Sequence, residues 1–184
     1  MDNTSQPFHT DVNKGREANA YLYYILHNYD NLPSTVAFLH PHRLGYPAAW
    51  HNDASNYDNV ASLKALNIDF IQKNGYANLR CIWEPGCPEE VQPFRAPPAD
   101  SKEVSTENTL GVVWPQFFGP REIPKAIGTP CCAQFAVSRE QIRARPLSDY
   151  KIYHDWLMRT PLSDDISGRV FEYLWHIIFG QDPV

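Results

Sequence analysis

The fold is decided around one stretch of the chain, Thr35-Val36-Ala37-Phe38-Leu39-His40-Pro41-His42-Arg43. Its first five residues are β-branched, aromatic or aliphatic, and Pro33-Ser34 marks the start of the run, so we predict a short buried strand. Because successive side chains of a strand point to opposite faces, His40 and His42 should leave the end of this strand on the same side.

A third imidazole and a carboxylate follow in Trp50-His51-Asn52-Asp53. Imidazole titrates near neutral pH and is a frequent metal ligand. The segment is therefore a candidate for proton transfer by His40, His42 and His51, or for a metal held by these histidines together with Asp53. Spacing alone does not define a metal site, and histidines that only end a strand and bond to loop carbonyls would give the same pattern.

The composition is that of a folded chain with an acidic balance. Hydrophobic residues make up 43% and aromatic residues 13%, which is too rich for a disordered protein. The formal charge of -5 and the pI of about 5.8 argue against a nucleic-acid partner, and no apolar run is long enough to span a bilayer. Residues 1–6 lack the apolar core of a signal peptide, so we expect a soluble, cytoplasmic protein.

The four cysteines do not form a recognised metal or redox motif. Cys81 and Cys87 are six positions apart, and Cys131 and Cys132 are adjacent. This spacing matches neither a zinc ribbon nor a Cys-x-x-Cys pair, and adjacent cysteines seldom bridge each other. We expect free, partly buried thiols, with a bridge from Cys81 or Cys87 to the adjacent pair only in an oxidising compartment.

Short apolar runs alternate with capped helical patterns, which predicts one α/β domain over residues 1–184 with a small sheet flanked by helices. The predicted strands cover residues 35–40, 76–83 and 132–137, and the predicted helices cover 15–29, 59–66, 148–157 and 168–179, with a further helix starting at 139. From Pro88 to Glu107 the chain is Pro-rich and polar, so this segment should be a loop or mobile lid beside the site.

Helix caps and the helix dipole explain several polar residues without any chemistry. Asn13 is the expected N-cap of the first helix, and Glu17 in its first turn would interact favourably with the helix dipole. Ser138, with a glutamine three residues later, has the spacing of a capping box. Arg16 and Arg43 could bind an anionic group, although a solvated surface position would also explain each of them.

The last predicted helix is apolar nearly all round and should be buried. Ser167 is its expected start and Gly180 its expected C-terminal cap. Glu172 and His176 lie four residues apart and therefore share one face. A buried glutamate must be paired or protonated, so we predict that His176 is its partner, either as a structural brace or as an acid–base pair.

Motifs spread over the chain are similar to those of one fungal family. They are Asn13-Lys14-Gly15-Arg16-Glu17-Ala18, Asn28-Tyr29-Asp30-Asn31-Leu32-Pro33, Phe38-Leu39-His40-Pro41-His42-Arg43, Trp50-His51, Asn78-Leu79-Arg80-Cys81, Pro85-Gly86-Cys87-Pro88, Cys131-Cys132-Ala133-Gln134-Phe135-Ala136-Val137-Ser138-Arg139 and Ser167-Gly168-Arg169-Val170-Phe171-Glu172-Tyr173-Leu174-Trp175-His176. The family is catalogued as domain of unknown function 3431. The resemblance implies a fungal protein, for which secondary metabolism is a natural setting, and it implies no settled activity.

The layout is also similar to a truncated core of glycosyltransferases with the A-type nucleotide-sugar fold. That resemblance implies a metal-binding motif after a strand, where this chain has His40-Pro41-His42, and a carboxylate from a late helix, where it has Glu172. It also implies a strand–helix unit that residues 1–12 are too short to form. The chain has no Asp-x-Asp motif and no Gly-rich phosphate loop.

We therefore expect a small enzyme in which His40, His42, His51 and Glu172 form the working site and Arg43 steadies negative charge. The expected reaction is the cyclisation, rearrangement, elimination or hydrolysis of a small-molecule substrate, by acid–base chemistry or with a divalent metal as the one cofactor. The alternatives are a transferase that uses a nucleotide sugar and a non-catalytic protein that binds a small molecule.

Overall fold

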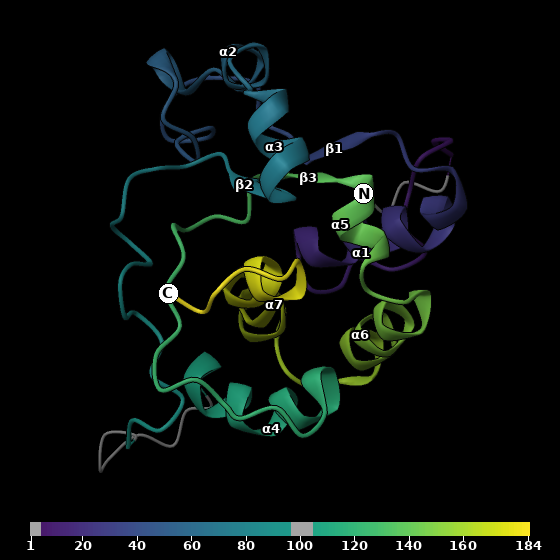
Figure 1. The fold of residues 1–184 in the computed structure, drawn as a ribbon, viewed down its shortest axis with the longest axis vertical. Helices are drawn as coiled ribbons and strands as arrows, with labels where there is room; N and C mark the ends of the chain where they lie inside the picture. Colours follow the sequence, from purple (N-terminus) through teal and green to yellow (C-terminus); the bar gives the residue numbers. More distant parts are fainter. Residues whose placement is uncertain (1–4, 97–104) are drawn as a thin grey trace.

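The computed structural model describes residues 5–96 and 105–184 (Figure 1). These residues form seven α-helices, two short 3₁₀ helices and one antiparallel sheet of three strands. The predicted single-domain α/β fold is thereby confirmed. None of the helices formed by the described residues is long and apolar enough to cross a bilayer.

The sheet is built on its central strand β3 (Phe135–Ser138), which pairs with β1 (Thr35–Phe38) on one side and β2 (Tyr76–Asn78) on the other. In the register, Ala136 lies opposite Ala37 of β1 and Ala77 of β2. All of β3 is buried, because its apolar side chains are covered on both faces.

Two of the strands end earlier than predicted. β1 ends at Phe38, so His40 and His42 lie beyond it, and strand alternation does not place them on one side. β2 stops at Asn78 instead of continuing to residue 83, because the Asn78 side chain accepts a hydrogen bond from the Arg80 backbone N–H at 3.0 Å and turns the chain out of the sheet.

The helices differ from the predictions at several boundaries. They are α1 (Glu17–Asn28), α2 (Asn59–Lys64), α3 (Ile68–Asn74), α4 (Thr106–Phe118), α5 (Arg139–Arg143), α6 (Leu147–Arg159) and α7 (Asp164–Ile178), with the 3₁₀ helices η1 (Tyr29–Asn31) and η2 (Ser55–Tyr57). Neither α3 nor α4 was predicted. The sequence of α4 contains Gly111 and Pro115, two residues that usually argue against a helix interior.

The predicted start of the last helix, at Ser167, was also wrong. α7 begins at Asp164, and Ser167 lies inside it with its hydroxyl donating to the Ser163 carbonyl at 2.9 Å. At the other end Gly180 has a φ of 77° and closes the helix, as predicted.

The N-caps of α1 and α5 differ in how well the local sequence predicts them. The N-cap of α1 is Arg16 and not Asn13. Ser138 caps α5 as predicted, since its hydroxyl accepts from the Gln141 N–H at 3.1 Å. The Gln141 side chain, however, donates to the carbonyl of Phe179 at 2.8 Å instead of completing a capping box.

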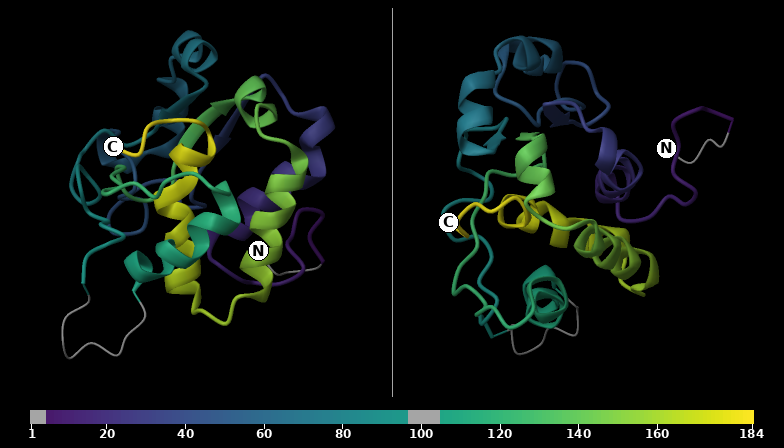
Figure 2. Two further views of the ribbon diagram at one scale, coloured as in Figure 1. Left: turned by 60° about the horizontal axis from the view of Figure 1, so that its bottom comes forward. Right: turned by 45° about the vertical axis from the view of Figure 1, so that its right-hand side comes forward.

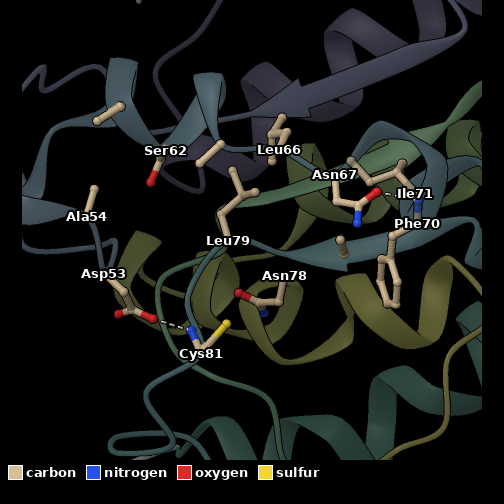
Figure 3. Close-up of a pocket in the computed structure, with 13 residues that line it drawn as sticks. Asp53, Ala54, Ser62, Leu66, Asn67, Phe70, Ile71, Asn78, Leu79 and Cys81 are labelled. Carbon is tan, nitrogen blue, oxygen red and sulfur yellow. Dashed lines mark hydrogen bonds between the residues drawn. The ribbon is translucent and has the colours of Figure 1, made fainter.

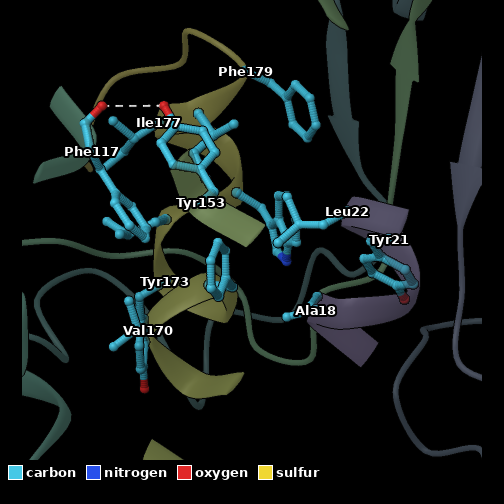
Figure 4. Close-up of a cluster of buried hydrophobic side chains, with 14 of the residues drawn as sticks. Ala18, Tyr21, Leu22, Phe117, Tyr153, Val170, Tyr173, Ile177 and Phe179 are labelled. Carbon is cyan, nitrogen blue, oxygen red and sulfur yellow. Dashed lines mark hydrogen bonds between the residues drawn. The ribbon is translucent and has the colours of Figure 1, made fainter. Parts of the chain in front are cut away.

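The hydrophobic core gathers around α7, which packs against α1 and α4 (Figures 1 and 2). Tyr21 of α1 and Trp175 of α7 both contact Phe135 of the sheet. Aromatic side chains dominate the core, and Phe171, Trp175 and Phe179 of the C-terminal segment are at most 1% exposed. Figure 4 shows residues of α1 and of α7 in this cluster. The prediction of a buried last helix is therefore confirmed.

Part of the predicted lid is attached to the core. Val91 is 2% exposed and forms an isolated β-bridge with Ile127, and the hydroxyl of Tyr173 donates to Glu90. Residues 97–104 lie outside the described residues, and from Thr106 the chain is helical. The described part of this segment thus has anchors that its polar composition did not predict.

The cysteines correct another prediction. Cys131 and Cys132 are joined by a disulfide between adjacent residues, whereas Cys81 and Cys87 are free thiols. The backbone accommodates the pair with positive φ angles of 87° at Cys132 and 47° at Ala133. The rule that adjacent cysteines seldom bridge did not hold here.

Candidate functional site

His40 and His51 are the predicted site residues that the structure brings into contact. His40 follows β1, His51 lies in the loop before η2, and their ring centroids are 4.4 Å apart. Both side chains are partly buried. Nε2 of His40 and Nδ1 of His51 are buried and have no hydrogen-bond partner among the described residues.

Gln134, just before β3, ties the two histidine segments together. Its side chain is fully buried. Oε1 accepts from the backbone N–H of His40 at 2.8 Å, and Nε2 donates to the backbone carbonyl of His51 at 2.8 Å. The amide thus fixes the distance between the two loops. Sequence analysis missed this role, although a polar residue at the entry of an otherwise apolar strand was a signal for it.

Arg80 and Trp50 continue the site beyond His51. The guanidinium of Arg80 lies 4.9 Å from the centroid of the Trp50 ring and donates to the carbonyls of Trp50 at 2.9 Å and Glu84 at 3.2 Å. Arg80 is 6% exposed, and its Nε has no partner in the described parts of the chain. This buried cation lies within one of the quoted motifs, but sequence analysis gave it no role.

His42 and Arg43 lie in the same loop, but both are exposed. The loop is held through their backbone: the Asn59 side chain donates to the carbonyl of His42 at 2.8 Å, and the Asn59 N–H donates to that of Arg43 at 2.9 Å. Asn52 is fully buried and donates to the Asn59 side chain at 2.9 Å. Two buried asparagines therefore replace regular secondary structure here.

Asp53 lies apart from the histidine pair. Its Oδ2 accepts from the backbone N–H groups of Cys81 and Ile82, and the residue lines a pocket of about 530 Å³ between the β2 edge and helices α2 and α3 (Figure 3). Among the described residues, no group of three or more His, Cys, Asp or Glu side chains is placed to hold a metal ion. The four-residue metal site that we hypothesised is not assembled in this structure.

The pKa of His40 is lowered to about 4, mainly by burial and in addition by the charges of His51, His42 and Arg16. Burial also lowers the pKa of His51, with smaller effects from His42 and Arg80. A base with a depressed pKa is unprotonated at neutral pH. Both imidazoles can therefore accept a proton or a hydrogen bond.

Glu17 is an ionisable group that sequence analysis explained by the helix dipole alone. Its pKa is raised to about 7, mainly by burial and in addition by the charge of Glu172, while a backbone hydrogen bond and the charge of Arg16 act in the opposite direction. A carboxyl with such a pKa is present in both the protonated and the ionised form near neutral pH. The charge of Arg16 affects the pKa of both Glu17 and His40.

Close packing of the start of α1 against α7 explains the burial of Glu17. The N–H of Gly15 donates to the Asp164 side chain at 2.9 Å, and Arg16 forms an ion pair with Asp165. A Cβ added at Gly168 would lie 3.0 Å from the carbonyl oxygen of Gly15, so glycine at this position permits the close approach of α7 to the start of α1.

Glu172 does not pair with His176, so that prediction was wrong. Oε1 of Glu172 accepts from the N–H of Cys132 at 2.7 Å, and Oε2 lies 4.0 Å from Nε of Arg169. Nε2 of His176 instead lies 3.3 Å from the carbonyl oxygen of Pro183. The backbone N–H of Cys132 is thus the partner of Glu172, in place of the predicted His176.

Three more buried polar atoms without a partner among the described residues belong to α1 and α7. They are the hydroxyl of Tyr21, one turn after Glu17 on α1, and Nε1 of Trp175 and Nδ1 of His176 on α7. The rings of Tyr21 and Trp175 lie 5.9 Å apart between centroids. The structure thus combines neutral imidazoles, a carboxyl with a near-neutral pKa and unused donors, which is a set suited to moving protons.

The sequence model of a family described as "Protein of unknown function (DUF3431)" matches residues 1–184, the whole chain. No curated protein and no solved structure matches the chain. The function is therefore inferred from the site.

Proposed function

We propose that this chain, which belongs to the DUF3431 family of proteins of unknown function, is an enzyme that transforms a small metabolite by acid–base chemistry. The observation that carries the proposal is the contact of His40 with His51 at 4.4 Å, with one buried and unpartnered nitrogen on each ring among the described residues. Buried polar atoms without partners are costly, and they are accounted for when a substrate supplies the missing bond.

In this proposal the roles of base and acid follow from the pKa values. His40, with a pKa lowered to about 4, is unprotonated and accepts a proton from the substrate. Glu17, with a pKa raised to about 7, donates a proton to the departing or rearranging group. Groups whose environments push their pKa values apart divide the acid and base roles in this way.

In this proposal Glu172 tunes the pKa of the acid, Glu17, and has no role at the base, His40. Its charge raises the pKa of Glu17, and its own position is fixed by the N–H of Cys132. An elimination, cyclisation or rearrangement needs one proton removed and one returned, which these groups supply. A metabolite of fungal secondary metabolism would be a suitable substrate.

The test is deuterium incorporation from D₂O. The purified chain is incubated in D₂O with a mixture of small metabolites, and mass spectrometry identifies compounds that gain deuterium or change in mass. We expect at least one compound to depend on the wild-type chain, and His40→Gln to reduce its conversion by about 100-fold or more. His27→Gln, at the exposed end of α1, is the matched control and should retain activity.

Full activity of a folded His40→Gln variant would refute the assignment. Calorimetric titration with a nucleoside diphosphate sugar and a divalent metal tests the competing hypothesis of a glycosyltransferase. Saturable binding in that titration would replace the present proposal.

A further inference from the structure

Three buried nitrogen atoms at one end of the sheet have no hydrogen-bond partner among the described residues. They are Nε2 of His40, Nδ1 of His51 and Nε of Arg80. The two rings are in contact, and Arg80 donates to the carbonyl of Trp50, the residue next to His51. These nitrogens therefore belong to one cluster, and each can donate a hydrogen bond when it carries a proton.

The charges that act on this cluster are positive. His40 is affected by His51, His42 and Arg16, and His51 by His42 and Arg80. The nearest carboxylate in sequence, Asp53, accepts its hydrogen bonds from the backbone of residues 81 and 82. The carboxylates of α1 and α7, Glu17 and Glu172, are not among the groups that shift either imidazole.

Arg80 is held in place before any ligand arrives. Its two terminal nitrogens are bonded to the carbonyls of Trp50 and Glu84, and its guanidinium lies over the Trp50 ring. At 6% exposure it is a buried cation with no carboxylate partner among the described residues. A buried charge without a counter-charge is expensive, and an anionic ligand would supply one.

We propose that His40, His51 and Arg80 form a binding site for an oxyanion, a carboxylate or phosphate group carried by the substrate. The inference rests on the proposed function and specifies its substrate class. An anion placed here stabilises a protonated imidazole relative to a neutral one. It also raises the basicity of His40 towards the operating pH, where a general base is most effective.

NMR titration of the histidine rings tests this site without knowledge of the substrate. The pKa of each histidine is measured at constant ionic strength in chloride, in acetate and in inorganic phosphate. We expect acetate, phosphate or both to raise the pKa of His40 by about one unit or more, in a saturable way. His154, a half-buried histidine on α6 whose pKa is also lowered by burial, is the internal control.

Variants separate the cluster from a general salt effect. Arg80→Met should weaken the binding of the effective anion by about tenfold, whereas Arg159→Met, an exposed arginine of α6, should not. If Arg80→Met does not fold, His51→Gln takes its place and should reduce the response of His40 to the anion.

Each outcome decides one question. A response to phosphate alone identifies a phosphate group, a response to acetate alone identifies a carboxylate, and a response to both supports the shared oxyanion chemistry. No response at His40, or an equal response at His154, overturns the anion site. Since the D₂O experiment does not depend on added anions, a negative titration leaves the acid–base proposal standing.

Discussion

His40 and His176 have the same lowered pKa in two very different regions. The pKa of each is lowered to about 4, with burial as the largest cause at both positions. His176 lies in the last turn of α7 among apolar residues, with the carbonyl of Pro183 as its neighbour. His40 touches a second imidazole, and Gln134 holds their loops together. Burial alone therefore does not mark a site, whereas a cluster of ionisable groups held by a dedicated polar residue does.

The largest expected effect is the loss of stability when a core side chain of α7 is truncated. Phe171 is fully buried and packs against Phe117, Trp156 and Trp175. Phe171→Ala removes these contacts and leaves a cavity, so the free energy of unfolding should fall by about 3–5 kcal/mol. Urea denaturation measures the change.

An exposed phenylalanine is the control for this loss. Phe94 is 67% exposed, and Phe94→Ala should change the free energy of unfolding by less than about 0.5 kcal/mol. A loss for Phe171→Ala as small as that of the control would mean that α7 is not the centre of the core.

The next largest effect is expected when the hydrogen bonds between Gln134 and the two histidine loops are removed. Gln134→Leu keeps a similar volume but leaves the His40 N–H and the His51 carbonyl without their partner. Each unsatisfied buried group costs about 1–3 kcal/mol, so with two such groups we expect a loss of at least about 2 kcal/mol in the free energy of unfolding. The NMR resonances of His40 and His51 should shift, and those of His176 should not.

Gln116→Leu is the matched control for that substitution. The Gln116 side chain is exposed and donates only within its own helix, to the carbonyl of Val112. If the two leucine variants lose similar stability, or if the His176 resonances move as much as those of His40, Gln134 has no special role in holding the loops.

The same comparison explains what the sequence could and could not predict. The strand at residues 35–38 and the buried helix α7 follow from local patterns of apolar residues. Gly180, which closes the end of α7 with a positive φ, is likewise a local signal. The prediction of a Glu172–His176 pair was wrong because a shared helix face does not determine which donor binds the carboxylate. The N–H of Cys132, 40 positions away in the sequence, takes the carboxylate instead.

The contacts of the candidate site were predicted only in part, for the same physical reason. His40 and His51 were found because imidazoles near a strand end are conspicuous in a sequence. The connection through Gln134, the buried position of Arg80 and the raised pKa of Glu17 all depend on contacts between distant segments. The pattern of residues within one element contains no record of such contacts.

A third prediction separates the two histidines by their charge partners. His51→Gln removes a positive charge that lowers the pKa of His40 when both rings are protonated. The pKa of His40 should therefore rise, while that of His176, which burial controls, should stay unchanged. NMR titration of both rings measures this difference, and an equal rise at both positions would contradict it.

Both histidines should also shape the dependence of stability on pH. Their folded pKa of about 4 lies below the unfolded value of 6.5, so the unfolded chain binds more protons between pH 4 and 6.5. Stability should rise with pH across this window and be lost as the pH falls through it. Glu17 opposes the trend between pH 4.5 and 7, because its folded pKa is the higher one. His40→Gln or His176→Gln should each flatten the acid side of the curve.

The smallest effect concerns the two carboxyl groups. Glu172→Gln keeps an acceptor for the Cys132 N–H but removes the charge that raises the pKa of Glu17. That pKa should therefore fall, yet stay above its ordinary value, because burial is the larger cause. Carbon-detected NMR titration of the carboxyl groups gives the shift. Glu140→Gln, an exposed substitution on α5, should leave Glu17 unchanged. If the pKa of Glu17 is unaltered in Glu172→Gln, the two carboxyl groups do not interact, and Glu172 has no role in tuning the proposed acid.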